Sequence, residues 1–208
     1  VVSMITTNLN DGADPTAKPI LEAASQHGIR YVRCGGLKYE KDGNPYDQLA
    51  GHLSKLRELS KMAEDLGLVL GYHNHSGMYN VGAPLWDLLW LVREIGSDSF
   101  GSNFDVGHAC IEGGLGAWEI NARVLAQYVK MMAVKDYLWE NKELQWVSLG
   151  SGQAKLVETL KIMRDAGFAG PISLHIEYKT PSRDALLDEI RQSVVVLRRY
   201  LEEAGFSA

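Results

Sequence analysis

The sequence has few cysteines, few prolines and no long apolar run. Only Cys34 and Cys110 occur among its 208 residues, which excludes a disulfide framework and makes a reducing, cytoplasmic compartment the expected location. No stretch approaches the roughly 18 apolar residues that cross a bilayer, so no membrane segment is predicted. The chain opens with VVSMITTNLN, without an initiator methionine or a charged leader, which leaves open a removed targeting signal.

An excess of positive charge is also lacking. The chain carries 21 Lys and Arg residues against 26 Asp and Glu residues, for a net charge of −5. A nucleic-acid surface needs a clustered basic face, so we expect no nucleic-acid partner and disfavour an endonuclease. With 46% hydrophobic residues and no Pro-, Ser- or Gly-rich linker, residues 1–208 are predicted to form a single domain.

What the sequence does contain is a strict alternation of short apolar runs and helical patterns. Glycine ends three of the helical patterns, at Gly28, Gly67 and Gly167, and each time leads into an apolar run. Such βα alternation predicts parallel strands joined by helical crossovers. The expected strands lie at 1–5, 29–34, 68–77, 101–106, 129–136 and 171–178, and the expected helices at 15–27, 46–66, 84–95, 118–128, 154–166 and 183–204.

The position of the polar residues favours a barrel over an open sheet. Histidine, carboxylate or lysine side chains stand at the ends of at least four strands, as they do in a barrel. An open sheet would place a Gly-rich phosphate turn at one switch point, and no G-x-G-x-x-G motif follows a strand here. We therefore predict an α/β fold, a (β/α)8 TIM barrel, of which the sequence covers six of eight units, strands three to eight, with Val1 opening strand three.

Two missing units would leave two unpaired parallel edges. We expect either a longer protein, with a βαβα portion before Val1, or a partner chain that closes the sheet, for which a second copy in a homo-oligomer is one form.

Several histidines and carboxylates are predicted to share the inner face. In a strand, residues i and i+2 point the same way, which pairs His73 with His75 and His175 with Glu177. Two imidazoles and a carboxylate from three strands predict an open divalent metal site. A hydrogen-bonded polar network without a metal is the alternative that spacing leaves open. The full inward set is His73, His75, Asp105, Lys135, His175 and Glu177, with His108 just past its strand.

The motifs YHNH (72–75), FDVGH (104–108), VKD (134–136), LGSG (149–152) and LHIEY (174–178), in this order, resemble the xylose-isomerase-like TIM-barrel superfamily. The resemblance implies a sugar or sugar-phosphate isomerase or epimerase that transfers a proton next to a carbonyl. Alternatives are an inosose-dehydratase-like lyase and a barrel that binds a carbohydrate or polyol without turnover. The family holds its metal with Glu, Asp, His and Glu, where this chain has His73, Asp105, Ala133 and His175.

The resemblance assigns roles residue by residue. With two carboxylates replaced by histidine, the site is expected to prefer Mn, Co or Zn to Mg. Arg33 is expected to meet a substrate carboxylate or phosphate, or else to serve as a salt-bridge partner, and Asp136 to fix Lys135 or to cap a loop. The predicted catalytic residues are His73, His175 and Lys135; the predicted metal ligands are Asp105, His73 and His175; the predicted substrate contacts are Arg33, His75, His108, Trp139 and Glu177.

Overall fold

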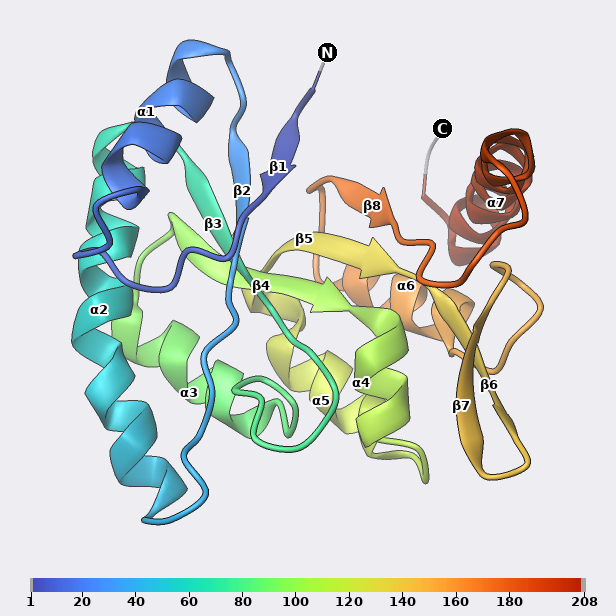
Figure 1. The fold of residues 1–208 in the computed structure, drawn as a ribbon, viewed down its shortest axis with the longest axis horizontal. Helices are drawn as coiled ribbons and strands as arrows, with labels where there is room; N and C mark the ends of the chain where they lie inside the picture. Colours follow the sequence, from blue (N-terminus) through green and yellow to red (C-terminus); the bar gives the residue numbers. More distant parts are fainter. Residues whose placement is uncertain (1, 207–208) are drawn as a thin grey trace.

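A computed structural model describes residues 2–206, so the predicted start at Val1 lies outside the described residues. Six strands form one parallel sheet in the spatial order β1-β2-β3-β4-β5-β8 (Figure 1). Neighbouring strands in the sheet follow one another in the chain except where a hairpin, β6 and β7, precedes β8. The sheet strands are β1 (Met4–Thr6), β2 (Tyr31–Cys34), β3 (Val69–His73), β4 (Phe100–Asp105), β5 (Val129–Val134) and β8 (Ile172–Leu174).

Helices connect these strands and cover the outer face of the curved sheet (Figure 1). All six predicted helices are confirmed, and glycines at positive φ end five of them, among them Gly28 at 70° and Gly67 at 68°. A side chain in this backbone region would be strained, so glycine stops the helix and turns the chain into the next strand. The helices are α1 (Ala17–Gln26), α2 (Pro45–Asp65), α3 (Trp86–Ile95), α4 (Val106–Glu112), α5 (Ala117–Leu125), α6 (Leu156–Asp165) and α7 (Arg183–Ala204), with a short 3-10 helix at Ala126–Tyr128.

The two faces of the sheet carry different side chains. Val32, Leu70 and Phe104 point outward and belong to one hydrophobic cluster with residues of the surrounding helices. Alternate positions, such as Arg33, His73 and Asp105, point to the inner face, as strand periodicity requires. The result is a partial barrel of six parallel strands, which confirms the predicted fold class. In the described part of the chain β1 and β8 are the sheet edges, and each pairs with a single neighbour.

Two elements were not predicted. The segment expected to be a long loop after β5 contains an antiparallel hairpin, β6 (Asp136–Glu140) and β7 (Glu143–Val147), which projects beyond the barrel (Figure 1). Its turn uses two residues with positive φ, Asn141 at 51° and Lys142 at 67°. The segment after β4, expected to be a loop, is helix α4, whose N-terminus is capped by the Asp105 side chain.

Two predicted strands extend too far. The third strand ends at His73, so the predicted inward position of His75 is wrong: Asn74 is buried and His75 is exposed in the following loop. The last strand ends at Leu174, so His175 and Glu177 lie on the segment that follows it. Within residues 2–206, none of the helices combines the length and the apolarity that crossing a bilayer demands.

Candidate active site

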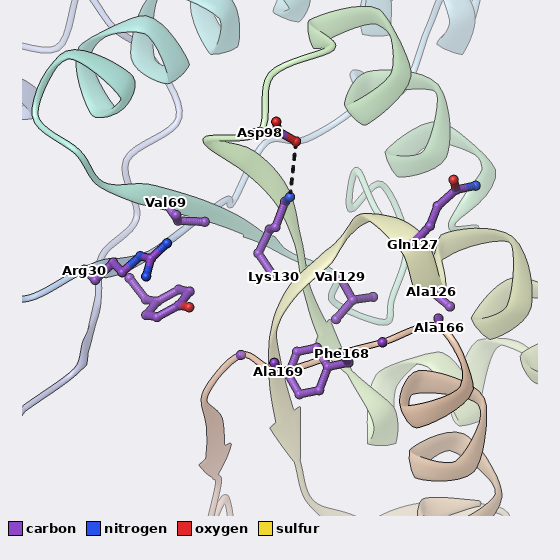
Figure 2. A pocket seen from close by; sticks show the side chains of 13 residues that line it. Arg30, Val69, Asp98, Ala126, Gln127, Val129, Lys130, Ala166, Phe168 and Ala169 are labelled. Atoms are coloured by element: carbon purple, nitrogen blue, oxygen red, sulfur yellow. Dashed lines mark ion pairs between the residues drawn. The ribbon is translucent and has the colours of Figure 1, made fainter.

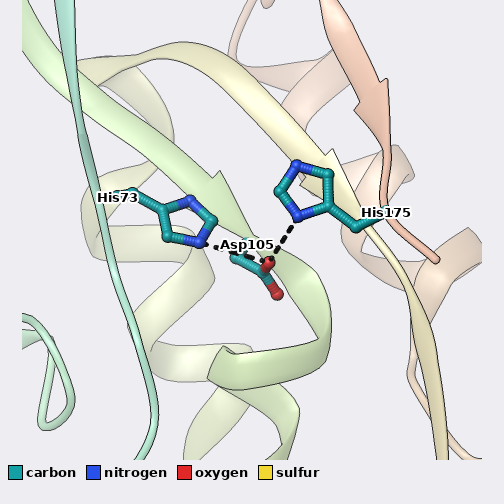
Figure 3. A group of neighbouring side chains, drawn as sticks. All are labelled: His73, Asp105 and His175. Atoms are coloured by element: carbon teal, nitrogen blue, oxygen red, sulfur yellow. Dashed lines mark ion pairs between the residues drawn. The ribbon is translucent and has the colours of Figure 1, made fainter. Parts of the chain in front are cut away.

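The carboxyl ends of β3, β4 and β8 bring His73, Asp105 and His175 together. Figure 3 shows the two imidazoles on either side of the Asp105 carboxylate. His73 Nε2 lies 3.6 Å and His175 Nδ1 3.9 Å from the same atom, Asp105 Oδ2. Asp105 is fully buried and His73 nearly so, whereas the side chain of His175 keeps 21% of its surface exposed. The group is therefore reached from the side of His175.

Lys135, the first residue after β5, occupies the centre of the polar cluster. Its side chain is only 2% exposed. The ammonium group donates to Glu177 Oε1 at 2.8 Å, contacts His108 Nε2 at 2.6 Å, and lies 3.3 Å from Asp105 Oδ2. The indole ring of Trp146, on β7, covers it from 4.3 Å, a cation–π contact. Lys135 thus links both carboxylates of the site.

His108 enters the site from α4 and not from a loop. Its backbone N–H donates to Asp105 Oδ1 at 2.9 Å, which is the cap that starts the helix. Because Nε2 accepts from the Lys135 ammonium, Nδ1 carries the ring proton and donates to Ser76 Oγ at 2.7 Å. Burial, reinforced by the Lys135 charge, lowers the pKa of His108 to about 2. The ring is therefore neutral, with a fixed tautomer.

Burial also shifts the pKa values of His73 and Asp105. It lowers the pKa of His73 far below its usual range, with the Arg33 charge acting in the same direction, so this imidazole is neutral. Burial raises the pKa of Asp105, and the Lys135 ammonium opposes that rise. Glu177 behaves differently, because contacts with His175 and Lys135 lower its pKa to about 2. Glu177 is an anion throughout the physiological range.

The residues present fit a divalent cation. One donor atom from each of His73, Asp105 and His175 lies within 4.8 Å of the other two. This spread suits ligands around one ion with bonds of about 2.0–2.2 Å. Asp105 Oδ2 is buried without a hydrogen-bond partner among the described residues, so it is available as a ligand. Two nitrogens and one oxygen form an open site of the kind that Zn and other transition metals occupy.

The contacts behind the two imidazoles also suit ligation. Ser173 Oγ donates to Met132 O at 3.2 Å and faces His175 Nε2 at 3.1 Å, so it accepts the Nε2 proton and leaves the Nδ1 lone pair toward Asp105. The Asn103 amide lies 3.3 Å from His73 Nδ1, and its Oδ1 has no partner among the described residues. Rotating this amide by half a turn lets Oδ1 accept from Nδ1–H and frees Nε2 for a metal.

Arg33 stands on the inner face of β2, beside β3. Its guanidinium makes one long hydrogen bond, from Nη1 to Thr7 O at 3.4 Å, while Nε is buried without a partner among residues 2–206. No carboxylate of the described chain comes within ion-pair distance of it. The salt-bridge role expected as the alternative is therefore absent from this part of the chain.

The remaining predicted residues lie at or beyond the rim. His75 stacks on His108 with ring centroids 3.9 Å apart, although its own Nδ1 bonds to Ser76 O. Trp139 is 52% exposed and lies further along the hairpin, next to Trp118 and Cys110, outside the cluster. Trp146 takes the position expected of Trp139.

Sequence reasoning assigned no role to Asn74, Ser76 and Asn103. The Asn74 side chain exchanges two hydrogen bonds with the backbone of Asp105, accepting from its N–H at 2.7 Å and donating to its carbonyl at 3.1 Å. This pair fixes β3 to β4 where the ligands emerge. The N-H-S run after His73 held the signal, since Asn and Ser next to a strand end commonly bond neighbouring backbone.

A cavity of about 540 Å³ (Figure 2) opens at the amino ends of β2, β3 and β5. The histidines lie at the opposite, carboxyl ends of the strands. Arg30, Lys130 and Phe168 line the cavity, and Lys130 pairs with the exposed Asp98 at 3.8 Å. In barrels the chemistry sits at the carboxyl ends of the strands, so the histidine cluster is the candidate active site.

Comparisons with known proteins agree with the fold. Residues 16–200 match a protein family described as xylose isomerase-like TIM barrel. An uncharacterised protein of Methanocaldococcus jannaschii is 30% identical over 156 residues, which are 74% of this chain and 50% of that protein. The chain thus spans about half the length of this curated relative.

Two crystal structures share the fold. A D-tagatose 3-epimerase-like protein superposes with a TM-score of 0.76 at 22% identity, over 98% of this chain and 78% of the other. The IOLI protein with a bound zinc atom superposes with a TM-score of 0.77 at 17% identity, over 95% and 76%. At these identities the likeness concerns the fold.

Proposed function

Because the chain belongs to the xylose isomerase-like TIM barrel family, we propose that it is an isomerase or epimerase of a sugar or sugar phosphate. The reaction is a proton transfer on the carbon next to a carbonyl group. The observation that carries this proposal is the pair of imidazoles, His73 and His175, on opposite sides of the Asp105 carboxylate at 3.6 and 3.9 Å. Imidazole is the side chain best suited to move protons near neutral pH.

The two imidazoles have different roles in the proposal. His175 is reached from solvent, and Ser173 orients its ring through Nε2. Its one free nitrogen, Nδ1, serves either as the base that takes the substrate proton or as a ligand of the cation, because a single lone pair cannot do both at once. His73 is closed off and neutral, which suits a metal ligand and a wall of the site. A divalent cation bound by His73, Asp105 and His175 would stabilise negative charge developing on the carbonyl oxygen. We expect Mn, Co or Zn there, because two of the three donors are nitrogen.

The surrounding groups bind and orient the substrate. Lys135 is a fixed positive charge beside the proton-transfer groups, and Glu177 and His108 hold it in place. Arg33 has unused N–H donors on the same inner face and binds substrate oxygens. Trp146 and His75, near the rim, cover the site and contact the sugar ring. A small-molecule sugar or polyol is the proposed ligand.

Exchange of substrate hydrogen with solvent tests the proposal. The purified protein is incubated in D₂O with Co²⁺ and a panel of ketoses, ketose phosphates and their epimers, and deuterium incorporation is followed by NMR. We expect exchange at the carbon next to the carbonyl, together with the isomer or epimer. His175→Ala should abolish both, and His27→Ala, on the exposed end of α1, should change neither.

Three outcomes would contradict the assignment. Loss of water from the substrate would identify a lyase of the dehydratase kind, which shares the abstraction step. Binding without exchange by any panel member would identify a carbohydrate-binding barrel. Unchanged turnover in His175→Ala would remove His175 from the chemistry.

A further inference from the structure

We infer that Lys135 sets the affinity of the site for divalent cations, because its buried ammonium group shares the Asp105 carboxylate with the ion. The inference rests on the metal site of the proposed function and adds to it a residue that is not itself a ligand. The ammonium lies 3.3 Å from Asp105 Oδ2, the oxygen that both candidate imidazole ligands also face. An entering cation therefore meets a positive charge beside its own ligand.

The contacts of Lys135 show that it cannot easily move aside. Its ammonium group is bound to Glu177 at 2.8 Å and to His108 at 2.6 Å, and the Trp146 ring covers it. A side-chain carbon added at Gly107 would lie 2.8 Å from Lys135 Cγ, so the backbone of α4 packs directly on the lysine stem. The charge stays in the site.

The charge balance of the site points the same way. Asp105 and Glu177 are its two carboxylates, and Lys135 is the one Lys or Arg of the described chain that pairs with either. The Lys135 charge partly neutralises Asp105 Oδ2, yet this oxygen has no hydrogen-bond partner among residues 2–206 and stays open to a ligand. Removing the ammonium group would leave two carboxylates without a counter-charge, an arrangement that a dication would stabilise.

Direct metal titration tests the inference without any assay of turnover. Co²⁺ binding is measured by calorimetry and by the visible absorption of the ion in the wild type, Lys135→Met, Lys135→Gln and Lys130→Met. Electrostatics between close charges predicts that loss of the Lys135 charge tightens Co²⁺ binding by about tenfold or more. Lys130→Met, at the other end of β5, removes the same charge far from Asp105 and should leave affinity within about twofold, since it pairs only with an exposed carboxylate.

Thermal unfolding supplies an independent readout. The metal-free Lys135 variants should melt below the wild type, because Asp105 loses its counter-charge, and saturating Co²⁺ should raise their Tm by more than it raises that of the wild type. Lys135→Gln retains hydrogen-bond donors for Glu177 and His108, so it tests the inference if Lys135→Met does not fold.

The outcomes separate this inference from the metal site itself. Unchanged or weaker Co²⁺ binding in both folded Lys135 variants, with the wild type binding normally, would overturn the inference alone. Binding by none of the proteins would overturn the metal site and, with it, the inference. In the Lys135→Gln background, His175→Ala should abolish the tightened binding; persistence of that binding would place the ion elsewhere and also overturn the inference.

Discussion

The Asp136 carboxylate should be one of the most sensitive single groups for stability. It follows Lys135 directly, is 2% exposed, and accepts four backbone N–H bonds. Tyr137 and Ala154 donate to Oδ1 at 2.9 and 3.0 Å, and Gly150 and Gly152 donate to Oδ2 at 3.0 and 2.9 Å. The carboxylate therefore ties the start of the hairpin to the loop that leads into α6.

The expected loss follows from those contacts. A hydrogen bond to a charged group contributes about 1.5–3 kcal/mol, but the loop donors are partly exposed and water replaces some of their bonds. We therefore expect Asp136→Ala to lower the free energy of unfolding by about 3 kcal/mol. Asp136→Asn keeps one acceptor oxygen and turns an NH₂ group toward two donors, so its loss should be about 2 kcal/mol.

Urea unfolding at neutral pH, followed by far-UV circular dichroism, measures these differences. Asp188→Ala is the matched control, because its pair with Arg191 is exposed on α7 and should contribute less than about 0.5 kcal/mol. A loss below about 1 kcal/mol in Asp136→Ala would refute the argument that this carboxylate anchors the loop.

Three further predictions concern backbone, pH and thiols. Gly101→Ala should destabilise by about 2 kcal/mol, because its Cβ would collide with the carbonyl of Tyr128, while Gly51→Ala, in open space on α2, should stabilise by up to about 1 kcal/mol; urea unfolding of both checks the opposite signs. The free energy of unfolding should fall as pH drops below about 6.5, by up to ~1.4 kcal/mol per pH unit for each of His73 and His108. Burial lowers the pKa of both rings in the folded protein, so the unfolded chain binds protons there that the folded chain does not. His108→Gln should reduce that slope in urea titrations at pH 7 and 5.5, and an unchanged slope would contradict the assignment of a neutral ring. Burial raises the pKa of Cys34 and Cys110 to about 12, so a thiol reagent at pH 8 should modify neither until the protein is unfolded, and rapid labelling of the native protein would disprove this.

The parallel sheet was predictable because local signals and long-range packing agree. Each strand is a short apolar run, and Gly28, Gly67 and Gly167 mark the helix ends that precede three of the runs. Strands that are covered by helices on one face keep outward apolar residues whichever neighbours they pair with. Alternation and the placement of polar residues were therefore enough to choose a barrel.

Sequence periodicity predicts neither helix α4 nor the hairpin. Helix α4 has seven residues, five of them buried, so it shows no polar face to mark a period. The sequence signal for α4 is its N-cap. Asp105, which is predicted as a metal ligand, also accepts the His108 N–H at the start of the helix. The hairpin turn lacks the Asn-Gly pair typical of two-residue turns, with Asn141 and Lys142 taking positive φ instead.

The sequence predicts which residues form the site better than it predicts how these residues are arranged. Strand parity placed His73, Asp105 and Lys135 on one face correctly, because His73 and Asp105 end regular strands and Lys135 directly follows one. It failed for His75, because β3 stops at His73 and the loop turns the next imidazole outward. Contacts such as the hydrogen bond between Ser76 and His108 join residues 32 positions apart, and no local pattern specifies them.

The small side chain of Ala133 helps to explain how His73 and His175 both approach one oxygen, Asp105 Oδ2. Asp105 pairs in register with Ala133, and Ala133 with Ser173, so these three residues form one row across β4, β5 and β8. Ala133 is fully buried and has no side chain beyond Cβ. A larger residue in the middle of the row would project into the inner face between Asp105 and the segment that carries His175. Ala133 therefore leaves room on the inner face for the imidazole of His175, which follows β8 and approaches Asp105 from the far end of this row. Ala133→Leu should accordingly weaken Co²⁺ binding while leaving the outer core of the barrel unchanged, and calorimetric titration beside an unfolding curve would show which of the two is affected.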